Sequence, residues 1–369
     1  SGNTTTGTES GTTLTVDQDV PVISETTAIT TPDNDTTPTV VMTSDQVGVI
    51  SSPSGQTLTG DVAAEAAAND VTFAALAANT YASVTLLVTD PAGNPSNPLT
   101  LTSFTIDTTD PSAFTVGAVA STGGTVVANY LNSTNTGVSV SVPVANDATL
   151  VNGTIQLRMK VGDNAYANIG SAATITAANV TQAVTLTDEQ IEAAGSYAED
   201  VALKFTAIIT DASGNTTTGT ESGTTLTVDQ SDPTVTFVSS STSDGSYKSG
   251  EIVPILIATN EAITVDTTSG TPSILLETGA SDDAVAYTSG SLSNVLIFNY
   301  TVGTGDTSSD LDYKTTSALV LNSGTITDAA GNPLVLTLPA VGALNSLGAN
   351  KNLVIDTTVP VISSVSPST

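Results

Sequence analysis

The sequence predicts an all-β protein built from sandwich domains in tandem, and three observations lead to this fold class. The apolar residues are mostly Val, Ile, Leu and Ala set among Thr, Ser and Gly, which is the composition of strands rather than of helices. Short apolar or alternating runs are bounded by clusters of Gly, Asn, Asp and Ser. A pair of motifs also recurs along the 369 residues, as expected for repeated domains.

The runs with the clearest strand pattern are 138–144, 154–161, 201–209, 225–229 and 294–302. One helix is expected over 187–195, where Thr187 or Asp188 would cap its start, acids occupy its first turn and Gly195 would end it. The stretch 61–70 is ambiguous, because its alanines favour helix whereas its place between strands favours a short loop.

The strongest internal signal is a duplication, since residues 1–18 recur without change at 213–230. A first motif, D-x-x-G-N, follows a strand-like run and predicts a tight hairpin turn in which Gly supplies a positive φ angle. It occurs at 90–94, 211–215 and 328–332. A second motif, D-x-x-x-P, ends the following run and occurs at 17–21, 107–111, 229–233 and 356–360.

Successive D-x-x-x-P motifs lie 90, 122 and 127 residues apart, which predicts three domains, at 19–108, 109–230 and 231–357. Residues 1–18 would be the last strand of a preceding repeat, and 358–369 a linker or the start of the next one. Domains of this size with many short strands favour two-sheet sandwiches of the immunoglobulin type. Tyr81 and Tyr197 lie where the tyrosine corner of such a domain would fall.

The composition excludes several classes of function. The chain has 36 Asp and Glu against 6 Lys and Arg, a net charge of -30, and no His, Cys or Trp. Zinc fingers, haem or iron–sulfur centres, His-based triads and Cys nucleophiles are therefore excluded. So few cations exclude a nucleic-acid partner, and the apolar runs are too short to span a membrane. With 4% aromatic residues, a glycosidase cleft lined by sugar-stacking rings is also unexpected, and we expect no enzymatic activity.

The motifs resemble those of the bacterial immunoglobulin-like repeats found in very large extracellular surface adhesins. In the third unit the resemblance extends over 243–251, 304–313, 327–332 and 346–358, and in the first over 30–40 and 88–109. The middle unit is similar mainly at its two ends. The resemblance implies a rigid or semi-rigid extracellular spacer on the cell surface, often stiffened by calcium between domains, whose partners are the neighbouring repeats. A calcium-stiffened adhesin stalk is the function we expect.

The topology of such sandwiches independently predicts where the acids meet. The final hairpin turn lies at the pole where the chain enters, so each D-x-x-G-N turn should face the D-x-x-x-P linker before it. Several oxygens would then converge at each joint, which suits Ca²⁺ and its about six to eight oxygen ligands. Without a cation the carboxylates would repel, or one would take up a proton at a raised pKa. The expected ligands are Asp17, Asp19, Asp90, Asn94, Asp107, Asp110, Asp211, Asn215, Asp229, Asp232, Asp328, Asn332 and Asp356.

Three alternatives stay open. The motifs could be plain turns with solvated carboxylates, because Asp and Asn are common turn residues. The chain could be the protomer of a filament, sheath or surface layer, in which the 1–18 strand pairs with another copy of the chain by β-strand complementation. It could be an accessory carbohydrate-binding module, although Tyr287, Tyr300 and Tyr313 do not obviously form the exposed strip this would need. Further acids weighed as ligands are Asp33, Asp35, Asp244, Asp306, Asp310 and Asp312.

Overall fold

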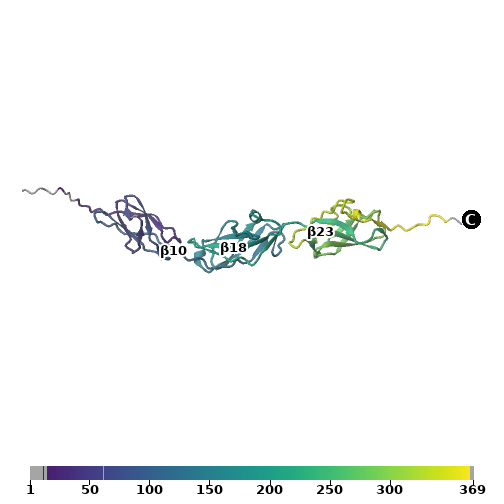
Figure 1. Cartoon of the computed structure of the whole chain (residues 1–369), viewed down its shortest axis with the longest axis horizontal. Coiled ribbons are helices and arrows are strands. Elements are labelled where there is room, and N and C mark those ends of the chain that lie inside the picture. Colours follow the sequence, from purple (N-terminus) through teal and green to yellow (C-terminus); the bar gives the residue numbers. More distant parts are fainter. Residues whose placement is uncertain (1–10, 12–14, 61, 366–369) are drawn as a thin grey trace, which may run out of the picture.

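The computed structural model describes residues 11, 15–60 and 62–365 and consists of three β domains placed end to end (Figure 1). Each domain has its own buried apolar cluster, and the members of the three clusters fall within 29–106, 116–228 and 238–355. We call these bodies domains 1, 2 and 3. The predicted fold class, all-β with immunoglobulin-like sandwiches in tandem, is confirmed. No helix of the described residues is long and apolar enough to cross a membrane.

Domain 1 consists of two four-stranded sheets and one strand pair. The sheet orders are β1-β2-β6-β4 and β5-β3-β8-β9, and β7 pairs with β10. Residues alternate between exposed and buried along β2 and β6, as expected for a sheet with one face on the core. The strands are β1 (Ile23–Thr27), β2 (Thr39–Ser44), β3 (Gly48–Ser51), β4 (Leu58–Thr59), β5 (Ala63–Ala64), β6 (Ala68–Phe73), β7 (Asn79–Tyr81), β8 (Thr85–Thr89), β9 (Leu99–Thr100) and β10 (Phe104–Ile106).

The ambiguous stretch 61–70 is not a helix in its described part, 62–70, but contributes β5 and the start of β6. The Asn69 side chain explains why a loop wins over the helix that alanine favours. Its Oδ1 accepts from the Glu65 N–H at 2.8 Å, and its Nδ2 donates to the Glu65 and Ala67 carbonyls at 3.1 and 2.9 Å. These bonds satisfy the backbone of a tight connection between two strands.

Domain 2 has two sheets that share one core, in the orders β11-β13-β17 and β12-β20-β18-β14-β15, with β16 on β14 and β19 on β18. The helix predicted at 187–195 is present as α1 but ends at Glu192, and Thr187 caps it in a capping box with Gln190. The elements are β11 (Val119–Thr122), β12 (Tyr130–Asn132), β13 (Gly137–Val144), η1 (Ala148–Leu150), β14 (Thr154–Val161), β15 (Ala167–Asn168), β16 (Ala173–Thr174), β17 (Val180–Thr187), α1 (Asp188–Glu192), β18 (Ala202–Thr210), β19 (Thr216–Thr218) and β20 (Leu226–Asp229).

Domain 3 is built around a long strand, β23, which pairs with β21 and β26 along its first part and with β29 at its end. The sheet continues through β25, β24 and β28, and β22-β30-β27 form a second sheet. The elements are β21 (Val235–Ser240), β22 (Gly245–Tyr247), β23 (Ile252–Asp266), β24 (Ser273–Leu276), β25 (Asp283–Ser289), β26 (Ser293–Thr301), β27 (Thr307–Ser308), β28 (Leu319–Val320), β29 (Thr325–Thr327), α2 (Leu347–Asn350) and β30 (Leu353–Asp356).

An early segment of every domain runs parallel to the end of its last strand. In domain 2 β12 pairs with β20, which places Asn132 opposite Asp229. In domain 3 β22 pairs with β30, and in domain 1 a single bridge joins Asp33 to Ile106. The early segment therefore lies at the pole from which the chain leaves for the next domain.

The tyrosine corner is confirmed in domain 1 and wrong in domain 2. The Tyr81 hydroxyl donates to the Ala77 carbonyl at 2.9 Å, four residues upstream. The buried Tyr197 hydroxyl has no hydrogen-bond partner among the described residues, because it follows α1 in a loop rather than lying in a strand. Domain 3 has an unpredicted corner, in which Tyr247 donates to the Ser243 carbonyl.

Two sequence predictions fall largely outside the described part of the chain. Residues 1–10 and 12–14 of the duplicated segment, and 366–369 at the other end, are not described. The assignment of 1–18 as the last strand of a preceding repeat, and of 358–369 as a linker or the start of a following repeat, therefore remains a prediction. So do the domain limits read from the motif spacing.

Candidate functional site: the joints between domains

The three D-x-x-G-N segments fold into the same hairpin turn, as predicted. In each, the N–H of the Asp donates to the carbonyl of the Asn, at 3.1, 3.0 and 3.1 Å in chain order. One carboxylate oxygen of the Asp accepts from the N–H of the Asn, at 2.8, 2.9 and 2.8 Å. The Gly has a φ of 98°, 99° and 95°, the left-handed conformation that glycine adopts without strain. The turn Asp is almost fully buried in all three domains.

The side chain of each turn Asn joins its domain to the preceding linker. Its Nδ2 donates to the second carboxylate oxygen of the turn Asp, at 2.9, 2.9 and 2.8 Å. It also donates to the backbone carbonyl of the linker Asp: Asn94 to Asp17 at 3.3 Å, Asn215 to Asp107 at 2.9 Å and Asn332 to Asp229 at 2.9 Å. Each turn therefore lies against the linker that the sequence analysis predicted for it, and the side-chain amide of the turn Asn joins the two.

The linker carboxylates make different contacts. Asp17, Asp107 and Asp356 each accept from the N–H two residues further on, at 3.0, 3.0 and 2.9 Å, so one oxygen of each faces its own linker. Only Asp229 also turns its carboxylate toward the next domain, because its Oδ1 accepts from Asn332 Nδ2 at 3.1 Å. The joints thus bring together a turn carboxylate, a linker carbonyl and an amide.

The second acid of each linker lies at the edge of its joint. Asp19 and Asp110 are exposed, and no hydrogen bond joins their carboxylates to the facing turn within the described residues. Asp232 is also exposed, but its Oδ1 accepts from the Ser133 hydroxyl of domain 2 at 2.9 Å. Among the contacts of the described residues, Asp232 is the one second acid that binds a side chain at its joint.

Acidic side chains lie near one another where domain 2 meets domain 3. Burial raises the pKa of Asp229, and the nearby Asp328 and Glu199 carboxylates raise it further. Burial likewise raises the pKa of Glu261 on β23, together with Asp328 and Asp229. At the entrance of domain 1, the hydrogen bond from the Asn94 side chain lowers the pKa of the turn residue Asp90. The carboxylates of the domain 2–domain 3 joint thus repel one another, and an added cation would relieve this repulsion.

The donor atoms of this joint have the chemistry of a calcium site, since they are carboxylate and carbonyl oxygens. These oxygens lie further apart than the ligands of an occupied calcium site would. No three Asp or Glu side chains in the part of the chain that is described are grouped closely enough to hold a metal ion. Glu261, which the motifs did not single out, is the additional carboxylate that the structure brings near Asp229 and Asp328.

Sequence reasoning missed two residues of this joint, Asn132 and Ser133. Asn132 is fully buried, and its Nδ2 donates across the joint to the Ala330 carbonyl at 2.7 Å. The N–H of Ser133 donates to Asn332 Oδ1 at 2.7 Å. No motif marked them, because the loop that carries them differs in every domain. The signal that could have found them is their register, since the residue opposite the linker Asp must face the next domain.

The further acids weighed as ligands are mostly engaged in local structure. Asp306 accepts from the Tyr300 hydroxyl and the Gly303 N–H, both at 2.6 Å. Asp312 is buried and accepts from the N–H groups of Tyr313 and Gly342 at 2.9 and 3.0 Å. The remaining acids accept from backbone N–H groups of their own domains; these are Asp33, Asp35, Asp244 and Asp310.

The tyrosines of domain 3 do not form an exposed strip. Tyr300 and Tyr313 are buried in the core, and Tyr287 packs edge-on against Phe298. A groove in domain 2 beside α1 has a volume of about 360 Å³. Its lining consists of apolar and amide side chains, including Met159, Ile169 and Gln190, without a titratable group.

No protein-family model and no curated protein matches the sequence. Among solved structures, the chain is similar to a structure from a 1.5-MDa bacterial ice-binding adhesin described in relation to host cell surface retention, with 17% identity over 88% of this chain and 100% of that chain and a TM-score of 0.29. It is also similar to the FN1–FN3 domains of chicken CNTN1, with 13% identity over 83% of this chain and 94% of that chain and a TM-score of 0.24. A three-domain segment of titin is similar with 10% identity over 83% of this chain and 98% of that chain, and a TM-score of 0.24. Likeness at this level concerns the type of domain and carries no argument about function.

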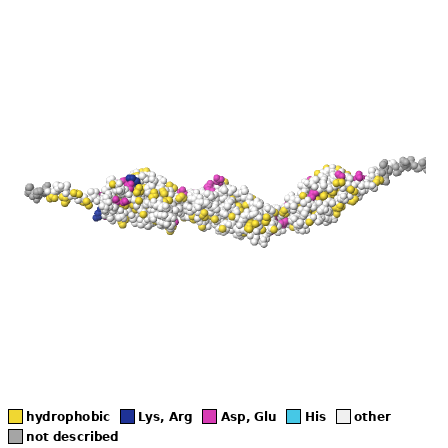
Figure 2. Space-filling model, turned by 180° about the vertical axis from the view of Figure 1, so that it is seen from behind, with side chains coloured by type: hydrophobic (Ala, Val, Ile, Leu, Met, Phe, Trp, Pro, Cys, Tyr) yellow, Lys and Arg dark blue, Asp and Glu magenta, His cyan; other side chains and the backbone are white. Residues whose placement is uncertain are grey.

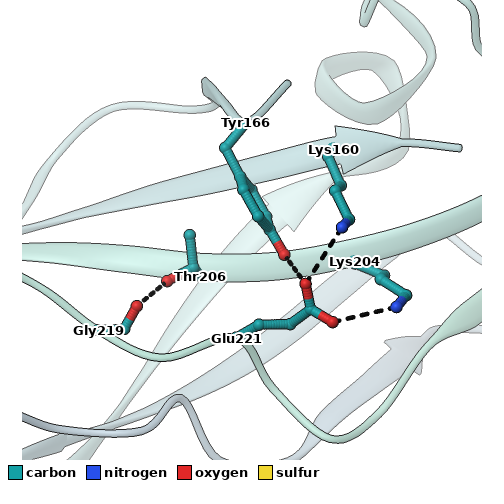
Figure 3. A network of polar contacts seen from close by, with 6 residues as sticks. All are labelled: Lys160, Tyr166, Lys204, Thr206, Gly219 and Glu221. Carbon is teal, nitrogen blue, oxygen red and sulfur yellow. Dashed lines mark hydrogen bonds and ion pairs between the residues drawn. The ribbon is translucent and has the colours of Figure 1, made fainter. Parts of the chain in front are cut away.

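Away from the joints, a network of polar contacts lies on domain 2 around Glu221. Glu221 accepts from the Tyr166 hydroxyl and contacts Lys160 at 3.3 Å with the same carboxylate oxygen, while its other oxygen contacts Lys204 at 3.1 Å (Figure 3). Lys160 and Lys204 are direct neighbours on β14 and β18, and Glu221 screens their repulsion. On the face shown in Figure 2, by contrast, the visible Lys and Arg lie over domain 3. The contacts of Glu221 stabilise the sheet that contains β14 and β18 and do not line a cleft.

Replacing Glu221 by glutamine is expected to destabilise domain 2 by about 1 kcal/mol near neutral pH, a modest value because the group is partly exposed. The Tyr166 and Lys204 hydrogen bonds lower the pKa of Glu221 from 4.5 to about 2. Its contribution is therefore complete above the unfolded pKa and is lost as the pH falls from 4.5 toward 2. Urea unfolding of the wild type and Glu221→Gln should differ near neutral pH and converge in acid. The exposed Asp163→Asn serves as the control, and a pH-independent difference would contradict this account.

Proposed function

We propose that this chain is a non-catalytic extracellular spacer, part of the stalk of a large surface adhesin, that holds a distal element away from the cell. The observation that carries the proposal is the joint itself. The same buried turn, with the same Asn-to-linker hydrogen bond, fixes the entrance of each of the three domains. Because the turn lies at one pole and the linker leaves from the other, this contact arranges the domains in a row (Figure 1).

Three separate cores fit this role better than the role of a binding or catalytic domain. Each apolar cluster supports one domain, so length can be added by repetition without enlarging any core. The net charge of -30 opposes association between copies and keeps such a row extended at low ionic strength.

We further propose that calcium binds at the joints and stiffens the row. The support is chemical: at the domain 2–domain 3 joint, Asp229 and Glu261 have raised pKa values because carboxylates are buried near one another. A divalent cation would neutralise this repulsion. Asp229, Asp328 and Glu261, together with Asp232 at the edge, would have to move closer together than they lie in the structure to hold it. Calcium at the other two joints would use Asp17, Asp19, Asp90 and Asn94, and Asp107, Asp110, Asp211 and Asn215.

Small-angle X-ray scattering of the full chain tests the spacer. We expect an elongated monomer at all concentrations, with a greater maximum dimension in calcium than in chelator. Growth of the particle with concentration would instead support the filament. An elongated profile that calcium leaves unchanged would retain the spacer and contradict calcium stiffening.

Calorimetric titration tests the metal separately. The Asp229→Asn, Asp232→Asn double variant should lose calcium binding at one joint while its turn stays intact, because neither residue lies in 328–332. Asp163→Asn is the control, because it removes a carboxylate at an exposed position outside the joints. Equal calcium binding by the double variant and the control would exclude these residues as ligands.

A further inference from the structure

The joint between domains 2 and 3 has a second set of contacts beyond the turn Asn. Asn132 Nδ2 donates to the Ala330 carbonyl, the Ser133 N–H donates to Asn332 Oδ1, and the Ser133 hydroxyl donates to Asp232. The loop also encloses the turn closely, because a Cβ added at Gly331 would lie 2.9 Å from Val127. Domain 2 thus contacts the D-x-x-G-N turn of domain 3 on two sides. We call Asn132 and Ser133 the 132–133 corner.

In the part of the chain that the structure describes, the joint between domains 1 and 2 lacks this second set of contacts. Within the described residues, the hydrogen bond from Asn215 Nδ2 to the Asp107 carbonyl, at 2.9 Å, is the one that joins domain 1 to domain 2. The Thr217 hydroxyl binds the linker further on, at the Pro111 carbonyl (2.5 Å). The bridge from Asp33 to Ile106 places Asn34 at the position equivalent to Asn132. Asn34 lies near the turn, 3.3 Å from a Cβ built at Gly214, but forms no hydrogen bond with it in the part of the chain described.

A difference of two residues explains this asymmetry. Asp33 of domain 1 uses its Oδ1 to accept from the Asp35 N–H at 3.0 Å, so this N–H is turned inward. The equivalent of Asp33 in domain 2 is the buried Leu131, which has no acceptor, and the equivalent N–H of Ser133 donates to Asn332 instead. Asp35 also replaces the hydroxyl donor of Ser133 by a carboxylate, which cannot donate to an acidic linker.

We propose that the chain is unevenly stiff: the 132–133 corner holds domains 2 and 3 as one rigid pair without metal, whereas the joint between domains 1 and 2 is a hinge. Several hydrogen bonds on two sides of a turn restrict rotation about the linker, while a single bond at one point leaves it free to pivot. The proposal goes beyond the spacer function and holds whether or not calcium binds.

The absence of Cys from the sequence makes the test direct, because introduced pairs of Cys can carry spin labels at chosen sites. Ser83, Ser171 and Ser269 are exposed positions, one in each domain, and make no side-chain hydrogen bond among the described contacts. Double electron–electron resonance on the full chain in chelator compares the 83–171 pair with the 171–269 pair. We expect a narrower distance distribution for 171–269, and equal widths would overturn the proposal.

Substitutions then identify the cause. Ser133→Ala should broaden the distribution of distances between labels at 171 and 269, and the double variant Asn132→Ala, Ser133→Ala should broaden it more. Asn34→Ala should leave the distribution between 83 and 171 unchanged. Because Asn132 is buried, its loss could unfold domain 2. The decisive variant is therefore one that should add a contact at the joint between domains 1 and 2. Asp33→Ala frees the Asp35 N–H to reach Asn215 and should narrow the 83–171 distribution, a gain that unfolding cannot produce. An unchanged 83–171 width in Asp33→Ala would refute the stated cause.

Discussion

Replacing Asn332 by alanine is expected to reduce the free energy of unfolding of domain 3 by about 2–3 kcal/mol and to loosen its joint with domain 2. Asn332 is fully buried and donates to Asp229 and Asp328 while accepting from Ser133. Its loss leaves Oδ2 of Asp328 and the Ser133 N–H without the partner that each has in the wild type, in a place that water reaches poorly. Buried polar groups left unpaired carry most of the cost of such a substitution.

Hydrogen–deuterium exchange of the full chain, resolved by peptide, measures this effect in each domain. Exchange should increase in domain 3 and in the 125–133 loop of domain 2, and remain unchanged in domain 1. Asn294→Ala is the matched control, because Asn294 is exposed on β26 and its side chain makes no hydrogen bond among the described contacts. If both variants exchanged alike, the joint would contribute nothing to the stability of domain 3.

Replacing Phe298 by alanine should cost domain 3 about 3–5 kcal/mol and leave domains 1 and 2 unaffected. Phe298 is fully buried at the centre of the domain 3 cluster, where it packs against Tyr287. Removing its ring leaves a cavity that the surrounding strands cannot fill, since β23 and β25 on either side are fixed by their ladders. The other clusters share no residue with this one, so no loss of packing reaches them.

Differential scanning calorimetry of the full chain tests this independence. The transition of domain 3 should move to lower temperature in Phe298→Ala while the others keep their midpoints. Phe237→Ala provides the control, because Phe237 lies in the same domain with 41% of its surface exposed. A common shift of all transitions would show that the three domains unfold as one cooperative unit.

The fold and the pairing of turns with linkers could be predicted because both depend on short-range chemistry repeated along the chain. Apolar runs such as 154–161 became strands at the expected positions, and the Gly of each D-x-x-G-N motif has the positive φ that the turn requires. Once the sandwich topology was assumed, the turn and the preceding linker had to meet. The meeting of Asn215 with Asp107 follows from that topology.

What the sequence could not provide was the orientation of side chains at the joints. A pattern of acids does not reveal that the Asp107 carboxylate accepts from the N–H of its own linker. Nor does it reveal that the Asn215 amide lies between the Asp107 carbonyl and the Asp211 carboxylate. The contribution of Asn132 was equally hidden, since it depends on the register of β12 against β20. Such long-range registers are set by packing of the whole domain and leave no local signal.

The parallel pairing of an early segment with the last strand determines how each domain bears tension. Pulling on the two ends of the row draws the strands of such a pair past each other along their axes, so every rung of the ladder is loaded at once. The pairs β12–β20 and β22–β30 have three rungs each, whereas domain 1 has the single bridge from Asp33 to Ile106. We therefore expect domain 1 to extend before the two domains that follow it when the row is pulled.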